Sequence, residues 1–214
     1  KLFAGRYVAG ESAMDAILSA KELNKKGFAV TLDILGEHVK TKSEAEEITH
    51  EYIILYKLLA EHKIDGNISL KPTHIGLDIS IEEFEKNLTK LLKVAKETDN
   101  FLRIDMESSE ITQQIIETTL KFQLKYHNVG TVMQAYLHRT INDIEILNKN
   151  NLLNLRLCKG IYKESEKMAI QSRTKINDNY LLILDKIIDL NGYVGLATHD
   201  QSLIESIYQK IKQK

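Results

Sequence analysis

The most constraining feature of the sequence is a regular alternation of six short apolar runs with longer amphipathic segments. The runs are rich in Val, Ile, Leu and Phe, and most of them lack the polar–apolar alternation of a half-exposed strand. They are Phe28–Leu32, Asn67–Leu70, Phe101–Ile104, Thr131–Ala135, Leu153–Cys158 and Tyr193–Ala197. Their ends recur about every 33 residues, which is the length of one strand–helix unit.

Between these runs, apolar residues recur at the spacing of amphipathic helices. Ser43-Glu44-Ala45-Glu46 and Ser80-Ile81-Glu82-Glu83 fit capping boxes at two helix starts, and Gly27 fits the cap that ends the first helix. We expect further helices at Ser12–Lys26, Glu110–Tyr126, Asn142–Asn150, Ser165–Leu190 and Ser202–Lys212. One helix followed by six strand–helix pairs predicts right-handed βαβ units and a parallel sheet, in a single domain that spans residues 1–214.

Two architectures accept this order: a doubly wound open sheet and a (β/α)8 barrel. The open sheet commonly binds nucleotides through a glycine-rich first turn, but the turn Leu32–Glu37 lacks the G-x-G-x-x-G pattern and no Walker A motif occurs. Polar residues instead follow nearly every strand, where barrel enzymes place their chemistry. We therefore predict an α/β fold of the (β/α)8 TIM-barrel type. Since a full barrel takes about 250 residues, we expect an incomplete barrel domain with about six of the eight units.

The composition excludes several classes of protein. No run of about 18 apolar residues occurs, so we expect no transmembrane helix. The 29 Lys and Arg residues balance the 30 Asp and Glu residues, which argues against a nucleic-acid-binding protein. The single cysteine, Cys158, rules out an intrachain disulfide and a four-cysteine zinc site, and it favours a reducing, cytoplasmic setting. Because the chain begins at Lys1 with neither an initiator Met nor a signal-peptide pattern, we expect a fragment.

Three of the strand-end segments carry residues with evident chemistry. Lys71 precedes Pro72, which stiffens the turn, and its ammonium either binds an anionic group of a substrate or is solvated in a loop. Asp105 ends the next strand and could orient a substrate, bind a metal, balance a cationic cluster or cap the following helix. Gln134 lies in an apolar strand, where a buried amide needs hydrogen-bond partners and can pair with the edge of a heteroaromatic ring.

The richest segment is Leu155–Glu164. Arg156 lies within the strand, where an unpaired charge is costly, so we expect an acidic or electron-rich partner. Gly160 permits a close approach of the backbone, and Tyr162 could form a wall of a pocket.

Thr198, His199 and Asp200 follow the last strand. Asp200 or Ser202 can cap the next helix, whose N-terminus could also help to hold a phosphate. A metal site of His199, Asp200 and Asp105 is a further option, but the H-E-x-x-H pattern is absent, and we predict no metal.

Six segments together resemble the proline dehydrogenase family, in the order of that family and over almost the whole chain. They are Arg6-Tyr7-Val8-Ala9-Gly10-Glu11, Ser69-Leu70-Lys71, Arg103-Ile104-Asp105-Met106-Glu107, Gln134-Ala135-Tyr136-Leu137, Arg156-Leu157-Cys158-Lys159-Gly160-Ile161-Tyr162 and Ala197-Thr198-His199-Asp200. Each is short, but six in order make a specific pattern. The spacing resembles the bacterial monofunctional type. Most N-terminal helices, the last two strands and the final helix of the family have no counterpart, so we expect a chain truncated at both ends.

The resemblance implies a distorted (β/α)8 barrel that binds FAD noncovalently. It implies oxidation of L-proline to Δ1-pyrroline-5-carboxylate, the first step of proline catabolism to glutamate, with a hydride passing from proline to flavin N5. The electrons then pass to a membrane quinone. The implied localisation is cytoplasmic, with peripheral contact at the inner face of the membrane. Pyrroline-5-carboxylate dehydrogenase is a candidate partner, and no nucleic acid is expected.

The resemblance also implies roles for single residues. Lys71 would pair with the carboxylate of proline, Asp105 would lie beside the substrate, and Tyr162 would pack against the proline ring. Gln134 would contact the isoalloxazine edge and Arg156 the region near N5, so Asp105 and Arg156 are the predicted catalytic residues. The other predicted cofactor-binding residues are Cys158, Lys159, Gly160, Thr198 and His199.

Two other interpretations remain open. A Schiff-base lyase of the aldolase type could use Lys159 or Lys71 on a barrel strand. An inactive barrel fragment is the other, because the family's C-terminal helix carries a Tyr-x-x-Arg-Arg pattern that binds the proline carboxylate, and this chain has no such segment.

Overall fold

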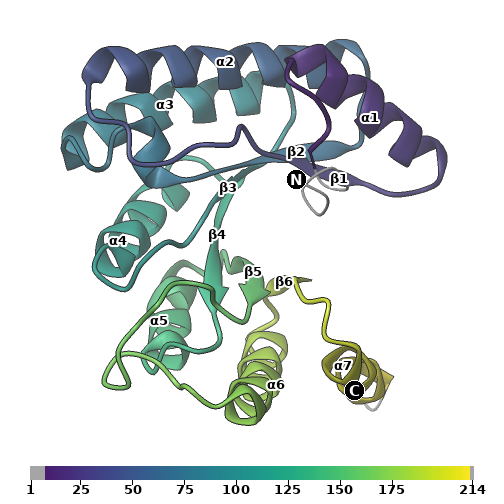
Figure 1. Ribbon diagram of the computed structural model, residues 1–214, viewed down its shortest axis with the longest axis vertical. Coiled ribbons are helices and arrows are strands. Elements are labelled where there is room, and N and C mark those ends of the chain that lie inside the picture. The colour runs from purple at the N-terminus through teal and green to yellow at the C-terminus, as the bar shows by residue number, and fades with distance from the viewer. Residues whose placement is uncertain (1–7, 213–214) are drawn as a thin grey trace. The chain divides into compact units, whose positions relative to one another are not determined.

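The chain forms two compact units, which meet in the sequence between Arg103 and Ile104. A computed structural model describes residues 8–212, and strands alternate with helices in both units (Figure 1). Arg6 and Tyr7, which begin the first family-like segment, lie outside the described residues. The order of one helix followed by six strand–helix pairs is confirmed, and the single domain stays a prediction.

The first unit holds the strands and helices of the N-terminal half. Its elements are α1 (Ala13–Lys25), β1 (Val30–Leu32), α2 (Lys42–Glu61), β2 (Gly66–Leu70), the 3-10 helix η2 (Pro72–Ile75), α3 (Ile81–Glu97) and the start of β3 (Leu102–Ile104). β1 and β2 are parallel, with Leu32 opposite Ile68. The N–H of Ile68 also donates to the carbonyl oxygen of Phe101, 3.4 Å away. Parallel strands need a crossover connection, which α2 provides between β1 and β2.

The core of the first unit is built on α2 and α3, which pack side by side (Figure 1). The buried side chains include Tyr52, Leu55, Tyr56 and Leu59 of α2 and Phe84, Leu88, Leu91 and Leu92 of α3. These are the positions at which apolar residues recur in the sequence at helical spacing. The periodicity therefore locates the buried face of both helices.

Side-chain caps determine where α2 and α3 begin. Ser80 accepts the N–H of Glu83 at the start of α3, which confirms the N-cap half of the predicted capping box. α2 begins with a capping box between Thr41 and Glu44, so the predicted box that starts at Ser43 is wrong. Thr41 offers the same hydroxyl two residues earlier, and Glu44 then stands at the position that can bond back to it.

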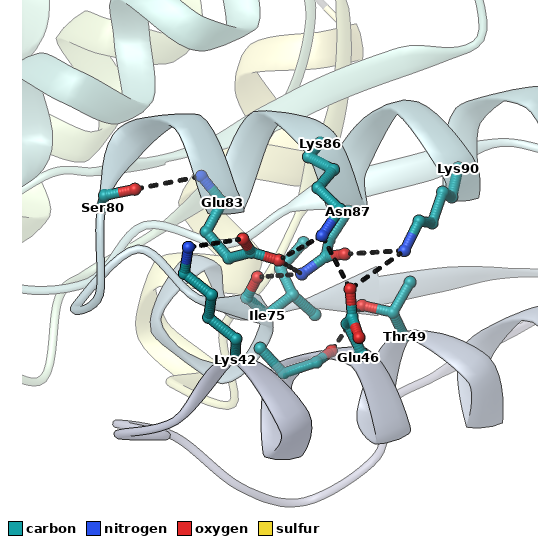
Figure 2. A network of polar contacts seen from close by, with 10 residues as sticks. Lys42, Glu46, Thr49, Ile75, Ser80, Glu83, Lys86, Asn87 and Lys90 are labelled. Carbon is teal, nitrogen blue, oxygen red and sulfur yellow. Dashed lines mark hydrogen bonds and ion pairs between the residues drawn. The ribbon is translucent and has the colours of Figure 1, made fainter.

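A polar network joins α2, α3 and the turn η2 (Figure 2). Glu83 is buried, and its carboxylate lies between the Nζ atoms of Lys42 and Lys86, 3.9 and 3.0 Å away. Asn87 is fully buried and donates Nδ2 to the carbonyl oxygen of Ile75 at 3.1 Å and to the Glu83 carboxylate at 3.4 Å. Buried polar groups need such partners. The network thus fixes the turn that follows β2.

The second unit continues the alternation after β3. Its elements are α4 (Thr112–Gln123), β4 (Val129–Gln134), α5 (Thr140–Leu147), the 3-10 helix η3 (Asn148–Asn150), β5 (Asn154–Cys158), α6 (Arg173–Asp189), β6 (Tyr193–Leu196) and α7 (Gln201–Lys212). β4, β5 and β6 are parallel neighbours in chain order. Oγ1 of Thr131 donates to the carbonyl oxygen of Ile104 at 2.9 Å. α6 packs on β5 and β6, and the hydroxyl of Tyr180 donates to the carbonyl oxygen of Leu157 at 2.8 Å.

The predicted strands agree closely with the structure, and one predicted helix does not. All six strands are present, and their ends differ from the predicted ones by no more than two residues. Gly27 caps α1 with a φ of 84°, as predicted. The helix predicted from Ser165 is wrong over its first eight residues, because α6 begins at Arg173. Within residues 8–212, no helix has the length and apolar character that crossing a bilayer requires.

Replacing Asn87 with Leu should lower the free energy of unfolding by about 1–3 kcal/mol, because the carbonyl oxygen of Ile75 and the carboxylate of Glu83 each lose a buried donor. The two side chains are similar in size, so cavity formation adds little. Urea denaturation followed by circular dichroism measures the change. Lys93→Leu, at an exposed position of the same helix, is the matched control and should change stability by less than about 0.5 kcal/mol. Equal stabilities of the two variants would contradict the role of Asn87.

Candidate functional site

The strand register of the second unit places three predicted residues on one face of its sheet. Gln134 lies opposite Cys158, and Arg156 lies two residues before Cys158 on β5. Residues two apart on a strand share a face, so all three side chains point to the same side. β5 alternates between buried and half-buried positions, whereas β4 is buried along its whole length.

The guanidinium of Arg156 binds the carboxylate of Asp105. The Nη2 atom lies 2.9 Å from Oδ1, and the two side chains are 29% and 21% exposed. The expectation of an acidic partner for Arg156 is therefore confirmed. A charge-assisted hydrogen bond of this kind holds the guanidinium in one orientation, and it joins the two predicted catalytic residues directly.

The amide of Gln134 is held by the backbone around it. Gln134 is buried, and its Nε2 donates to the carbonyl oxygen of Glu107 at 2.8 Å. The backbone carbonyl oxygen of Gln134 accepts the hydroxyl of Thr140 at 2.6 Å. The side chain thus has the hydrogen-bond partner that a buried amide requires, and its orientation is fixed.

Cys158 lies at the end of β5, opposite Gln134 and two residues after Arg156. Burial raises the pKa of the Cys158 thiol to about 11, and the backbone of Gly160 and the charge of Arg156 offset only part of that effect. The thiol is therefore protonated at neutral pH and behaves as a small apolar side chain.

Lys159 and the residues after β6 form a second polar cluster. The Nζ atom of Lys159 lies 2.5 Å from Oδ2 of Asp200, and this bond, helped by the hydroxyl of Ser202, holds the pKa of the Asp200 carboxyl far below its usual range. Oδ1 of Asp200 accepts the N–H of Leu203, so Asp200 caps α7 as one of the two predicted options. Oγ1 of Thr198 accepts the N–H of Asp200 at 3.1 Å. A carboxylate therefore stands at the helix N-terminus where a phosphate could otherwise bind.

The loop after β5 carries two more predicted residues. Gly160 has a φ of 109°, which favours glycine, and Tyr162 is half-buried. The carboxylate of Glu164 anchors this loop, because it accepts the N–H and the hydroxyl of Ser109 at 2.7 and 2.6 Å. His199 is exposed and lies next to the cap of α7 in the sequence.

Lys71 lies in the first unit, directly after β2. Its backbone is extended, as expected before Pro72, and its Nζ binds the carboxylate of Glu37. This hydrogen bond lowers the pKa of the Glu37 carboxyl. Glu37 and the buried His74, whose pKa is lowered chiefly by burial, were not among the residues predicted from the sequence. Glu37 follows a strand, as the predicted site residues do, and this position in the sequence could have identified it as a candidate.

A cavity of about 620 Å³ also lies in the first unit, beside β1. Gly10, Ser12, Asp33, Leu35 and Glu51 are among the described residues that line it. None of the site residues predicted from the sequence belongs to this lining.

Comparison with known proteins identifies the family. A family model described as proline dehydrogenase matches residues 16–214. The chain belongs to the proline dehydrogenase family. Proline dehydrogenase 2 of Bacillus subtilis strain 168 is 38% identical over all 214 residues, which cover 70% of that relative. Proline dehydrogenase of Deinococcus radiodurans is 29% identical over 95% of this chain and 67% of that relative. The prediction that this chain is an enzyme of the proline dehydrogenase family is confirmed.

Longer proteins also match this chain. The bifunctional protein PutA of Escherichia coli is 28% identical over 98% of this chain, which covers 19% of PutA. The higher identity with the Bacillus enzyme confirms the predicted bacterial monofunctional type. PutA of Bdellovibrio bacteriovorus inactivated by N-propargylglycine has a crystal structure that matches with a TM-score of 0.84 at 21% identity, over 94% of this chain and about a quarter (26%) of that one. This likeness confirms the predicted barrel-type fold.

The thiol of Cys158 should react slowly with iodoacetamide at pH 8, because the thiolate is the reactive form and the raised pKa keeps it scarce. Relative to the protein unfolded in urea, where the pKa returns to about 8.5, alkylation of the folded protein should be on the order of a hundredfold slower. Mass spectrometry of quenched samples gives both rates without interference, since this chain has one cysteine. Similar rates in the folded and unfolded protein would show that the thiol is not buried.

Proposed function

We propose that this member of the proline dehydrogenase family oxidises L-proline to Δ1-pyrroline-5-carboxylate with FAD as cofactor. The observation that carries the proposal is the Arg156–Asp105 pair, in which Asp105 directly follows β3 and Arg156 lies two residues before the end of β5, next to Gln134 and Cys158. Barrel enzymes place their chemistry at this end of the strands. The pair offers a fixed cation for charge that develops on a cofactor and a carboxylate for a substrate that carries an amine.

Three residues are proposed to bind proline. Lys71 binds its carboxylate, and the existing bond from Lys71 to the Glu37 carboxylate supports this role, because it is the same pairing of groups. Asp105 lies beside the substrate amine and keeps Arg156 in place. The half-buried Tyr162 packs against the proline ring.

The described residues of the second unit fit a flavin nucleotide by their chemistry. Arg156 and Lys159 are cations, Gln134 is a buried amide, and Thr198 is a hydroxyl that can donate. When bound, FAD supplies the acceptor for the hydride that proline loses. Arg156, oriented by Asp105, favours the negative charge that accompanies this reduction. The remaining proposed contacts are Cys158, Gly160 and His199.

The proposal extends to the partners of the reaction. The family resemblance supports a membrane quinone as the electron acceptor and pyrroline-5-carboxylate dehydrogenase as the enzyme that takes the product. PutA, named a bifunctional protein, is itself a relative of this chain. We place the protein in the cytoplasm, with peripheral contact at the inner face of the membrane where the quinone is reached.

The Schiff-base alternative has weaker support in the structure. It requires a neutral amine as nucleophile. The amines of Lys71 and Lys159 are instead bonded to the carboxylates of Glu37 and Asp200. Both arrangements suit an ammonium that holds an anion, so we do not pursue a lyase as a second function.

The purified protein should show flavin absorbance bands, or gain them when FAD is supplied, and the bands should bleach anaerobically on addition of L-proline. D-proline is the matched control, because it has the same groups and the opposite hand, and it should leave the bands unchanged. A protein that stays colourless after incubation with FAD would sink the proposal. Trapping of a borohydride-stable adduct would then favour the lyase, and its absence the inactive fragment.

Replacing Arg156 with Gln should raise the Kd for FAD or slow flavin reduction by proline about tenfold or more, because the fixed positive charge is lost while a polar side chain is kept. Fluorescence titration and stopped-flow absorbance measure the two quantities. Arg173→Gln, at the exposed start of α6, removes the same charge outside the cluster and should leave both within about twofold. Wild-type values for Arg156→Gln would remove this residue from the proposed cofactor site.

A further inference from the structure

Tyr136 stands at a junction between β4 and the loop that follows β5. It is 6% exposed. Its N–H donates to the carbonyl oxygen of Lys159 at 2.9 Å, and its carbonyl oxygen accepts the N–H of Ile170 at 2.7 Å. The backbone of Tyr136 is thus bonded near both ends of the loop between β5 and α6. The adjacent Leu137 forms an antiparallel bridge with Ala169, which strengthens the second connection.

The ring of Tyr136 lies against the backbone of Gly160. A β-carbon on Gly160 would stand 2.2 Å from Cδ1 and 2.3 Å from Cε1 of the ring, closer than any side chain tolerates. The φ of 109° at Gly160 favours glycine as well. The close approach that we expected of Gly160 is therefore made to an aromatic side chain of the same unit.

The contact between Tyr136 and Gly160 is made by the ring and not by the hydroxyl group. Among residues 8–212, the buried hydroxyl of Tyr136 makes no hydrogen bond of good geometry, and the backbone of Tyr162 is a weak neighbour at most. Burial, with smaller contributions from Glu164 and Cys158, raises the pKa of Tyr136 to about 12, and the backbone of Tyr162 offsets part of that effect, so the side chain stays neutral at physiological pH. Leu137 and Ala169 form a buried cluster with the ring. A phenylalanine would make the same packing contacts, and it would leave no unpaired buried hydroxyl.

We propose that Tyr136 is a positioning residue that sets the place of the Lys159–Tyr162 segment. The inference rests on the proposed function, in which Lys159 contacts FAD and Tyr162 contacts proline. The flat ring of Tyr136 determines how closely the backbone at Gly160 can approach. The hydrogen bond to the carbonyl oxygen of Lys159 fixes the position of this backbone along the direction of β5. Tyr136 itself touches neither ligand in this scheme and acts through Lys159 and Tyr162.

Four variants test this assignment. Tyr136→Phe removes only the hydroxyl, Tyr136→Leu removes the flat ring and keeps an apolar side chain, and Gly160→Ala adds the clashing β-carbon. Gly27→Ala is the matched control for glycine, because Gly27 also has a positive φ, of 84°, but has open space around its α-carbon. Each variant is assayed for the Kd of FAD, for kcat and KM with proline, and for hydrogen exchange of the amides of residues 159–162 without FAD.

We expect Tyr136→Leu and Gly160→Ala to raise the KM for proline or the Kd for FAD about tenfold or more and to speed amide exchange in residues 159–162 by a similar factor, since small displacements of binding groups have large effects. Tyr136→Phe and Gly27→Ala should stay within about twofold of wild type in both measurements. Circular dichroism should show unchanged secondary structure in all four, and if Tyr136→Leu fails to fold, Gly160→Ala decides the question.

The double variant Tyr136→Leu with Gly160→Ala separates this explanation from a direct clash between residue 160 and the cofactor. If the ring is what excludes a β-carbon, Gly160→Ala should have a smaller effect in the Tyr136→Leu background than in wild type. Equal effects in both backgrounds would overturn the proposal, as would loss of function in Tyr136→Phe. Should the protein bind no FAD, the proposed function fails, and amide exchange alone then decides: unchanged rates in Tyr136→Leu refute the positioning role.

Discussion

A guanidinium within a parallel strand is stable only when a partner neutralises it, and in this chain the partner of Arg156 is Asp105, 51 residues earlier in the sequence. The two come together through β4, where Thr131 bonds to Ile104 at the end of β3 and lies opposite Leu155 on β5. The polar face of the second unit depends on this pair. Removing either member would leave a half-buried charge without its compensating partner, which costs more than the bond contributes.

The strands and the buried helix faces could be predicted because their signals are local. A short apolar run such as Thr131–Ala135 suits a strand that is buried on both faces, and β4 is buried throughout. The segment from Ser165 to Ser172 was predicted to be helical, because it contains good helix formers, but it is a loop that precedes α6. Its backbone groups bond to the chain after β4, as Ile170 does to Tyr136. Tertiary hydrogen bonds override helix propensity there, and no window of sequence shows them.

The site was predictable to the extent that it follows from strand ends. Residue type and position sufficed to select Asp105 and Arg156, and the cost of an unpaired charge sufficed to expect a partner. Identifying Asp105 as the partner of Arg156 required the register of β3, β4 and β5, which appears only in the folded chain. Glu37 was missed for the same reason, because its importance lies in its bond to Lys71, 34 residues away, and not in any pattern around it. The dual use of the Asp200 carboxylate, as helix cap and ion-pair partner, is likewise a property of the folded chain.

The two lysine–carboxylate pairs differ in a way that suits their proposed ligands. Asp200 binds Lys159 through one oxygen and caps α7 through the other, and both side chains are 24% exposed, so this ammonium is tied to a helix end. Lys71 and Glu37 are 31% and 42% exposed, and an exposed pair of this kind contributes about 0–1 kcal/mol. Exchanging Glu37 for another carboxylate therefore costs little, which suits a substrate that binds and leaves in each turnover. A rigidly held ammonium suits instead a cofactor that remains bound.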